Sequence, residues 1–314
     1  MYKHCIILIP FYFYSMIRPP FLKPGDKIGI TCPARKITLD EIEVAINSLE
    51  NWGLEVVLGD TINKSAHQYA GTDTERRADL QRMMNDTSIK AIIAARGGYG
   101  TVRIMDDLDF RVFMDAPKWL IGFSDITCLH TLLSCNIGIE SLHATMPISF
   151  PKNTNEALQS LHDALFGNTL NYKFPTHPLN RKGTMQGEII GGNLSILYAN
   201  LGTKTILDTH KKILLLEDLD EYLYHIDRMM MALKRAGKLK HLAGLVVGGM
   251  TDMKDNAIPF GKTAEEIIAE HVAEYEYPVC FNFPCGHIAD NRAVFMAKHA
   301  TVLVEETGSI FKQL

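Results

Sequence analysis

Short apolar runs alternate with longer amphipathic segments between residues 27 and 150. We expect strands at residues 27–31, 54–58 and 89–95, where β-branched and aliphatic residues gather. Parallel strands need a long crossover connection, which is usually a helix, so this alternation is typical of βαβ units. The sequence therefore predicts an α/β fold with a parallel sheet in its N-terminal domain.

Capping boxes predict where two helices of this domain begin. Thr38 is followed three residues later by Glu41, and Thr72 is followed in the same way by Glu75. In this pattern the threonine side chain accepts a hydrogen bond from a free backbone N–H of the first turn, and the glutamate returns one. The helices expected in this domain span residues 38–52, 72–85 and 153–166.

Changes in composition divide the chain into two domains. A polar stretch with Pro175 and Pro178 separates the halves and is predicted to be a linker. The second half mixes apolar strands with amphipathic helices, which indicates a smaller α+β domain. Its expected elements are strands at 212–217 and 244–248 and helices at 226–236 and 262–274. The predicted segments are an N-terminal extension at 1–15, the first domain at 16–167, the linker at 168–187 and the second domain at 188–314.

The composition describes a globular protein with a core, because 46% of the 314 residues are apolar and 22% are charged. The net charge of -4 comes from interspersed signs without a basic tract, so we expect no nucleic-acid partner and favour a small molecule or a peptide. The six cysteines form no C-x-x-C pair, which favours free thiols in a reducing compartment. We therefore expect a cytoplasmic protein.

The first fifteen residues combine a cationic start with a short apolar run. Pro10 interrupts the run, which is too short to span a bilayer, so we expect no membrane segment there. The alternative is a signal peptide, which would need small residues before its cleavage site, and Phe13 and Tyr14 do not supply them. We interpret residues 1–15 as the result of a start assigned too early and expect the native chain to begin at Met16.

The glycine-rich segment 96–100 follows a predicted strand, where a nucleotide-binding loop would lie. It departs from the dinucleotide fingerprint, because Arg103 stands where the third glycine is required. The chain has no Walker loop and no His-Glu-x-x-His zinc motif. Cys280, Cys285 and His287 also lack the spacing of a standard zinc site. We therefore expect neither a cofactor nor a metal.

Ser124 lies between an apolar run at residues 119–121 and a helix-like segment at 126–133. A serine on such a strand-to-helix turn projects its hydroxyl from the sheet edge, where backbone N–H groups of the helix start can stabilise an oxyanion. Gly122 leaves room for the turn. The pattern Gly-x-Ser-Asp is also an ordinary helix cap, so the position alone does not establish a nucleophile.

Acyl transfer by a serine needs a base that takes its proton and an acid that orients that base. Glu217 ends a buried apolar strand, and His287 follows the turn after another. Since catalytic groups of α/β proteins gather at the carboxyl ends of strands, these residues and Ser124 form a candidate triad. The rival residues are Asp218 and Glu221 for the acid and His143 for the base.

Five blocks of the sequence resemble, in their order, the LD-carboxypeptidase family, the muramoyl-tetrapeptide carboxypeptidases. They are residues 96–103 (RGGYGTVR), 121–125 (IGFSD), 191–194 (GGNL), 216–218 with 224–228 (LED and YHIDR) and 283–287 (FPCGH). The resemblance runs from about Met16 to the end of the chain. It implies a serine peptidase whose triad is Ser124, Glu217 and His287, in a cleft between two domains.

The resemblance also implies a substrate and a setting. Members of the family release the terminal D-alanine of murein tetrapeptides during cell-wall recycling in the cytoplasm, as homodimers that need no metal. For such a reaction we expect the backbone N–H groups of Gly98 and Asp125 to hold the oxyanion. Arg103 is our candidate for the substrate carboxylate, because a guanidinium grips a carboxylate with two hydrogen bonds, although it could equally form a surface ion pair.

Two alternatives accompany this assignment. One is a peptidase of the related microcin-immunity type that acts on a peptidyl-nucleotide amide, and the other is a non-catalytic muropeptide-binding protein. The chain departs from the family pattern at residues 293–298 (AVFMAK), where small residues around a Pro-Leu-Gly are usual, and at Cys285, where a larger residue is usual. These departures concern local substrate contacts and leave His287 in place.

The missing metal motifs lead to a first prediction. Incubation with EDTA should leave the release of D-alanine from a murein tetrapeptide unchanged, because the chain offers no standard set of metal ligands. The check is the amount of D-alanine released with and without the chelator. Activity that is lost to EDTA and restored by zinc would overturn a metal-independent mechanism.

Overall fold

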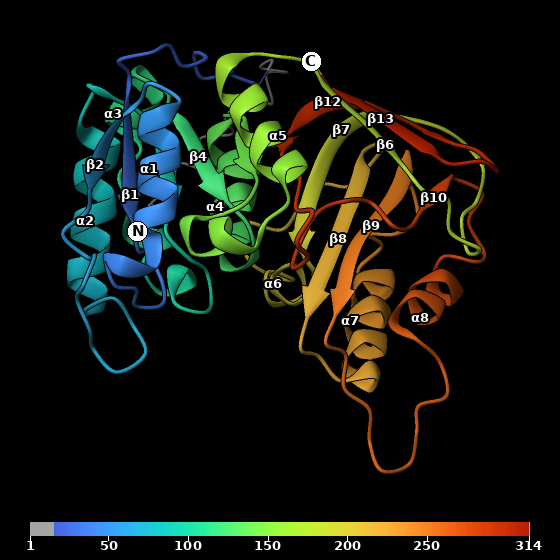
Figure 1. Cartoon of the computed structure of the whole chain (residues 1–314). Helices are drawn as coiled ribbons and strands as arrows, with labels where there is room; N and C mark the ends of the chain where they lie inside the picture. Colours follow the sequence, from blue (N-terminus) through green and yellow to red (C-terminus); the bar gives the residue numbers. More distant parts are fainter. Residues whose placement is uncertain (1–15, 314) are drawn as a thin grey trace, which may run out of the picture.

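The computed structural model describes residues 16–313, and the expected extension at residues 1–15 lies outside the described residues. Two sheets stand side by side, one built mainly by the first half of the chain and the other by the second half (Figure 1). Helices cover both sheets, as the alternation of apolar runs and amphipathic segments predicts. The expected α/β class is therefore confirmed.

The first sheet has six strands in the order β11-β5-β4-β3-β1-β2. Neighbouring strands from β1 to β5 pair in parallel, whereas β11 pairs antiparallel with β5. The strands are β1 (Lys27–Thr31), β2 (Glu55–Leu58), β3 (Ile89–Ala94), β4 (Trp119–Gly122), β5 (Ser141–His143) and β11 (Val294–Met296). The helices of this part are α1 (Glu43–Asn51), α2 (Asp73–Asn85), α3 (Arg111–Asp115), α4 (Thr127–Leu132) and α5 (Asn155–Phe166).

The expected elements of this part are present, with one difference at a helix start. The three expected strands are β1, β2 and β3, and α2 begins with the capping box of Thr72 and Glu75. The helix expected from Thr38 begins with a 3-10 turn at Asp40–Ile42 and becomes α-helical at Glu43. The Glu41 carboxylate accepts the backbone N–H of Thr38, which is only the glutamate half of the expected capping box.

The second sheet has seven strands in the order β10-β9-β8-β7-β12-β13-β6. Its strands from β10 to β7 pair in parallel, and those from β7 to β6 pair antiparallel. The strands are β6 (Leu170–Phe174), β7 (Gly183–Asn193), β8 (Ile213–Leu219), β9 (Gly244–Thr251), β10 (Val279–Cys280), β12 (Lys298–Val304) and β13 (Ser309–Gln313). The helices are α6 (Leu194–Ala199), α7 (Leu223–Arg235) and α8 (Ala264–His271).

Residues 168–187, which we expected to be a linker, contain strand β6 and the first residues of β7. In β6 the side chains of Leu170, Tyr172 and Phe174 are buried and alternate with exposed neighbours. This alternation is the pattern of a half-buried strand, but it covers only five residues beside a proline-rich stretch. The prolines lie after β6 and interrupt the segment without preventing the strand.

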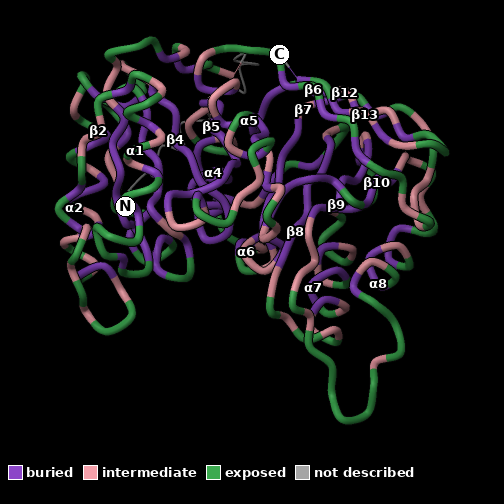
Figure 2. The backbone as a smooth tube through the Cα atoms, in the orientation of Figure 1, coloured by how far each residue is buried: buried purple, intermediate pink, exposed green. Residues whose placement is uncertain are grey.

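One short segment joins the two sheets. Strand β11 is an edge strand of the first sheet, where Phe295 lies opposite Leu142. Ala297 then turns the chain with a φ of 62°, and β12 continues in the second sheet, where Lys298 lies opposite Ile189. One hydrophobic core accordingly contains side chains from both sheets, and the central strands of each sheet are buried (Figure 2).

A search of residues 16–313 for membrane spans finds no helix with the length and apolar character that crossing a bilayer requires.

Two buried histidines lie beneath the end of β4, His130 on α4 and His143 at the end of β5. His130 Nε2 donates to the Gly122 carbonyl at 2.9 Å, and its Nδ1 accepts from the Ser141 hydroxyl at 2.8 Å. Burial lowers the pKa of His130 to about 3 and that of His143 to about 4. Both rings are therefore neutral near pH 7.

These histidines predict how stability depends on pH. The unfolded chain protonates them below about pH 6.5, whereas the folded protein resists protonation until about pH 4, so the unfolded state binds more protons in between. The free energy of unfolding should fall as the pH drops through this window. Urea unfolding at several pH values should show a shallower fall in His143→Leu. The same change at exposed His299 serves as the control, and equal slopes in both variants would contradict the prediction.

Candidate active site

The turn that carries Ser124 is strained in the way a nucleophile elbow requires. Ser124 follows β4 and Phe123, opens a 3-10 turn that leads into α4, and has a φ of 62°. A left-handed backbone costs about 1–2 kcal/mol for an L residue other than glycine, so the surrounding structure must hold it. A Cβ at Gly122 would lie 2.8 Å from Ile126 Cγ1, which explains why the turn needs a glycine there.

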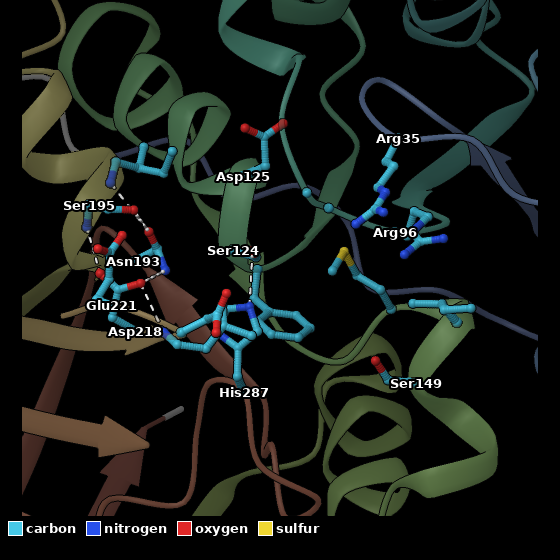
Figure 3. A pocket seen from close by; sticks show the side chains of 18 residues that line it. Arg35, Arg96, Ser124, Asp125, Ser149, Asn193, Ser195, Asp218, Glu221 and His287 are labelled. Atoms are coloured by element: carbon cyan, nitrogen blue, oxygen red, sulfur yellow. Dashed lines mark hydrogen bonds between the residues drawn. The ribbon is translucent and has the colours of Figure 1, made fainter. Parts of the chain in front are cut away.

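Ser124, His287 and Glu217 form a continuous hydrogen-bonded relay. The Ser124 hydroxyl donates to His287 Nε2 at 3.0 Å (Figure 3). His287 Nδ1 in turn donates to Glu217 Oε2 at 2.6 Å. The carboxylate can only accept, and this fixes the ring proton on Nδ1 and leaves Nε2 as the acceptor for the serine proton. The structure thus brings together the three residues of the candidate triad from both sheets.

Glu217 is wholly buried inside β8, rather than at the strand end that the sequence indicates. The pairing of β8 with β9 shifts its register between Leu216 and Asp218, so Glu217 sits at an irregularity of the ladder. Such bulges re-aim side chains, and this one lets Glu217 reach the His287 ring.

The rival residues take no part in the hydrogen-bonded relay. Asp218 accepts hydrogen bonds from Asn193 Nδ2 and from the Ser195 backbone N–H, both at 2.9 Å, and thereby fixes the start of α6. Burial, with the nearby charge of Glu217, raises the pKa of Asp218 to about 7. Glu221 Oε2 lies 2.6 Å from His225 Nδ1. His143 is fully buried, and neither of its ring nitrogens has a hydrogen-bond partner among residues 16–313.

Two opposing effects set the pKa of His287. Burial lowers it, but the charge of Glu217 and the hydrogen bond to that carboxylate outweigh burial, so the pKa of His287 is raised. Phe123 packs edge-on against the ring with centroids 4.8 Å apart and shields one side from water. The ring is therefore a stronger base than a free histidine and is held in one orientation.

The glycine loop after β3 lies directly against the nucleophile. A Cβ at Gly97 would lie 3.2 Å from Ser124 Oγ and 3.4 Å from the Asp125 backbone nitrogen. Gly98 and Asp125, our candidates for the oxyanion donors, both line the cavity in front of Ser124. The Asp125 side chain is buried and accepts the Thr101 backbone N–H at 2.9 Å, so it ties the nucleophile turn to the loop.

Arg103 does not lie at this cavity. It is half-exposed and grips Asp73 with two nitrogens, which is the surface ion pair we considered as the alternative. The arginines that line the cavity are Arg35 and Arg96. Arg96 stands in the glycine-loop block, and Arg35 follows the end of β1, so both lie near the strand edge where the sequence placed the site.

The cavity has a volume of about 470 Å³ and lies between the two sheets. Its walls are polar and include the candidate nucleophile and base, as Figure 3 shows. Within residues 16–313, no group of three or more His, Cys, Asp or Glu side chains is arranged to hold a metal ion. The relay presents a polarised serine in a concave site that is open to water. Such a site suits acyl transfer from a small peptide or amide.

The relay predicts a specific change in the titration of His287. In Glu217→Gln the pKa of His287 should fall, because the imidazolium loses the carboxylate that stabilises it. The measurement is an NMR titration of the histidine rings. Glu221→Gln is the matched control, since Glu221 contacts His225 instead. If the control shifts His287 and Glu217→Gln does not, the acid of the relay has been assigned four residues too early.

Two regions of the chain match models of known protein domains. Residues 28–144 match the LD-carboxypeptidase N-terminal domain, and residues 186–302 match the LD-carboxypeptidase C-terminal domain. The chain is 36% identical over 309 residues to a probable murein peptide carboxypeptidase of Bacillus subtilis (strain 168), an alignment that covers 93% of this chain and 94% of the relative.

Solved structures share the fold. Muramoyltetrapeptide carboxypeptidase from Oxalobacter formigenes superposes with a TM-score of 0.83 at 25% identity, covering 91% of this chain and 98% of that chain. MccF in complex with glutamyl sulfamoyl guanosine superposes with a TM-score of 0.84 at 19% identity, covering 96% and 99%. The two matched domains span more than half of the sequence, and this protein therefore belongs to the LD-carboxypeptidase family.

Proposed function

We propose that this protein is a serine-type carboxypeptidase that releases the terminal D-alanine from murein tetrapeptides, at the bond between an L-configured residue and D-alanine. The observation that carries the proposal is the relay from Ser124 through His287 to Glu217, at a cavity between the two sheets of a family member. The murein-peptide names of the Bacillus subtilis relative and of the Oxalobacter formigenes structure support the substrate class.

The proposed reaction follows from the geometry of the relay. Ser124 Oγ attacks the scissile carbonyl while His287 Nε2 takes its proton, and Glu217 stabilises the imidazolium. The C–N bond then breaks as His287 returns the proton to the leaving amine of D-alanine, and water hydrolyses the acyl-enzyme by the same steps. The N–H groups of Gly98 and Asp125 are the proposed donors to the oxyanion.

The proposal also includes the biological role, the cellular compartment and the oligomeric state. A role in peptidoglycan recycling in the cytoplasm, as a homodimer, is what the family resemblance implies, and the absence of C-x-x-C pairs is consistent with a reducing compartment. A peptidyl-nucleotide substrate is the alternative that the fold shared with MccF suggests. The hydrogen-bonded relay argues against a non-catalytic muropeptide-binding protein, because a binding module has no need of a polarised serine.

Stereochemistry provides the test of this function. A site that presents an L-centred carbonyl to Ser124 and holds a D-centred carboxylate distinguishes the two configurations, since inversion exchanges the methyl group and the hydrogen at the terminal residue. We predict release of D-alanine from a tetrapeptide that ends in L-lysyl-D-alanine. Little or no release should occur from the same peptide ending in L-alanine, or from the D-Ala-D-Ala bond of a pentapeptide.

The control for this experiment is Ser124→Ala, which should lose activity roughly a thousandfold or more, because it removes the nucleophile. Mass spectrometry of the products identifies the bond that is cut. Comparable rates on all three peptides would refute LD-specificity while the serine mechanism stands. Near-normal activity of Ser124→Ala would place the nucleophile elsewhere.

A further inference from the structure

The cavity in front of Ser124 has one cationic wall and one acidic wall. Arg35 and Arg96 stand on the side of the first sheet, and Asp220 and Glu221, which follow β8, stand on the opposite side. Figure 3 shows Arg35 and Arg96 across the cavity from Glu221, with Ser124 between them. A ligand that spans the nucleophile therefore meets opposite charges at its two ends.

The two cavity arginines have no ion-pair partner in the part of the chain that the structure describes. Among residues 16–313, neither Arg35 nor Arg96 forms a salt bridge, whereas Arg103 is paired with Asp73. Arg96 donates only to the Lys36 carbonyl at 3.2 Å, and burial together with the charge of Arg35 lowers its pKa. Two neighbouring cations repel each other, so the free enzyme carries a cost that a bound anion would remove.

Their position suits an anion close to the scissile bond. Arg96 directly precedes Gly97, whose Cα approaches the nucleophile, and Arg35 packs on Gly98, where a Cβ would lie 3.0 Å from Arg35 Cβ. In a carboxypeptidase substrate, the terminal carboxylate is attached to the carbon next to the scissile nitrogen. It therefore lies within a few bonds of Ser124 Oγ, on the side of the leaving residue.

On the acidic wall, Glu221 is the carboxylate best placed for a ligand. Its Oε2 bonds His225, and its Oε1 accepts no hydrogen bond from the part of the chain that the structure describes. Asp220 is paired with Lys254 at 2.7 Å, and both oxygens of Asp218 are used by Asn193 and by backbone N–H groups. Glu221 is half-buried, so an ion pair there is less screened by water than one on the surface.

We propose that this cavity selects a substrate with a carboxylate on the leaving residue, bound by Arg35 and Arg96, and an ammonium group on the side chain of the residue before the scissile bond, bound by Glu221. The proposal rests on the proposed carboxypeptidase function and specifies which peptides that function accepts. Glu221 is thereby a specificity-determining residue, and a peptide with a neutral or acidic side chain at that position binds weakly.

The experiment compares tetrapeptides that differ only in the side-chain ammonium, L-Ala-γ-D-Glu-L-Lys-D-Ala and its norleucine analogue. The wild-type enzyme should show a kcat/KM at least about tenfold higher for the lysyl peptide, as a charge-assisted hydrogen bond provides. In Glu221→Gln this ratio should fall toward one, mainly through KM. Glu221→Lys should invert the preference and favour a peptide with glutamate at the same position.

Two control variants separate the charge of Glu221 from its structural surroundings. His225→Asn removes the neighbour of Glu221 but keeps the carboxylate, so the lysyl preference should persist. Glu306→Gln removes an exposed glutamate that pairs with Lys182 far from the cavity and should also keep it. A ratio that falls equally in His225→Asn and Glu221→Gln would assign Glu221 a structural role and overturn the proposal.

The arginines are tested with a substrate whose terminal carboxylate is replaced by an amide, L-Lys-D-alaninamide at the end of the same tetrapeptide. The preference for the free acid should fall at least about tenfold in Arg35→Gln and Arg96→Gln, but not in Arg111→Gln, an exposed arginine paired with Asp109. Equal preference in all variants would overturn this half of the proposal.

The same assays distinguish failure of the inference from failure of the proposed function. Wild-type enzyme that releases D-alanine equally from the lysyl and norleucyl peptides performs the proposed reaction without the selection described here. Wild-type enzyme that releases D-alanine from neither peptide, and instead cuts a peptidyl-nucleotide amide, would overturn both.

Discussion

The fixed position of one sheet against the other is the constraint on which the candidate active site depends. Ser124 follows a strand of the first sheet, whereas Glu217 lies within the second and His287 follows it. A hydrogen bond weakens steeply when its atoms move apart by a few tenths of an ångström, so the relay needs the two sheets to act as one body. The shared core and the segment from β11 into β12 provide this rigidity. The Gln313 side chain on β13 adds to it, because it hydrogen-bonds the backbone N–H and carbonyl of Phe295 on β11 at 2.9 and 2.8 Å.

A second, local constraint holds the nucleophile in its strained turn. The Gly122 carbonyl, just before Ser124, is fixed by the buried ring of His130. Asp125, just after it, is fixed by the Thr101 backbone N–H of the glycine loop. Since hydrogen bonds on both sides anchor the turn in a dry environment, the unfavourable φ of Ser124 is offset by its neighbours rather than relaxed.

Much of the fold and the centre of the site were predictable from the sequence, because they depend on local patterns and one topological rule. Apolar runs indicated β1, β2 and β3, and capping residues indicated the start of α2. The rule that parallel strands present their carboxyl ends at one edge suggested that Ser124, Glu217 and His287 would meet, and the structure places them within hydrogen-bond distance.

The remaining features depend on contacts that no local pattern encodes. Arg103 pairs with Asp73 at the start of α2, whereas Arg35 and Arg96 line the cavity, and the sequence spacing predicts neither arrangement. Strand β6 was not predicted, because it is short and lies beside prolines that are typical of a linker. The short strand β11 lies far from β5 in the sequence, and its pairing with the first sheet could not be inferred from three apolar residues.

The position of β11 also has a consequence for the modularity of the chain. The region that matches the N-terminal family domain ends at residue 144, yet the strand that covers the free edge of β5 comes from residues 294–296. Without β11, the backbone N–H and C=O groups of β5 would be open to pairing with another chain. Although the sequence divides into two named domains, the first cannot be completed until the second has been synthesised. The sheet that carries Ser124 is therefore complete only when both matched regions are present in one chain.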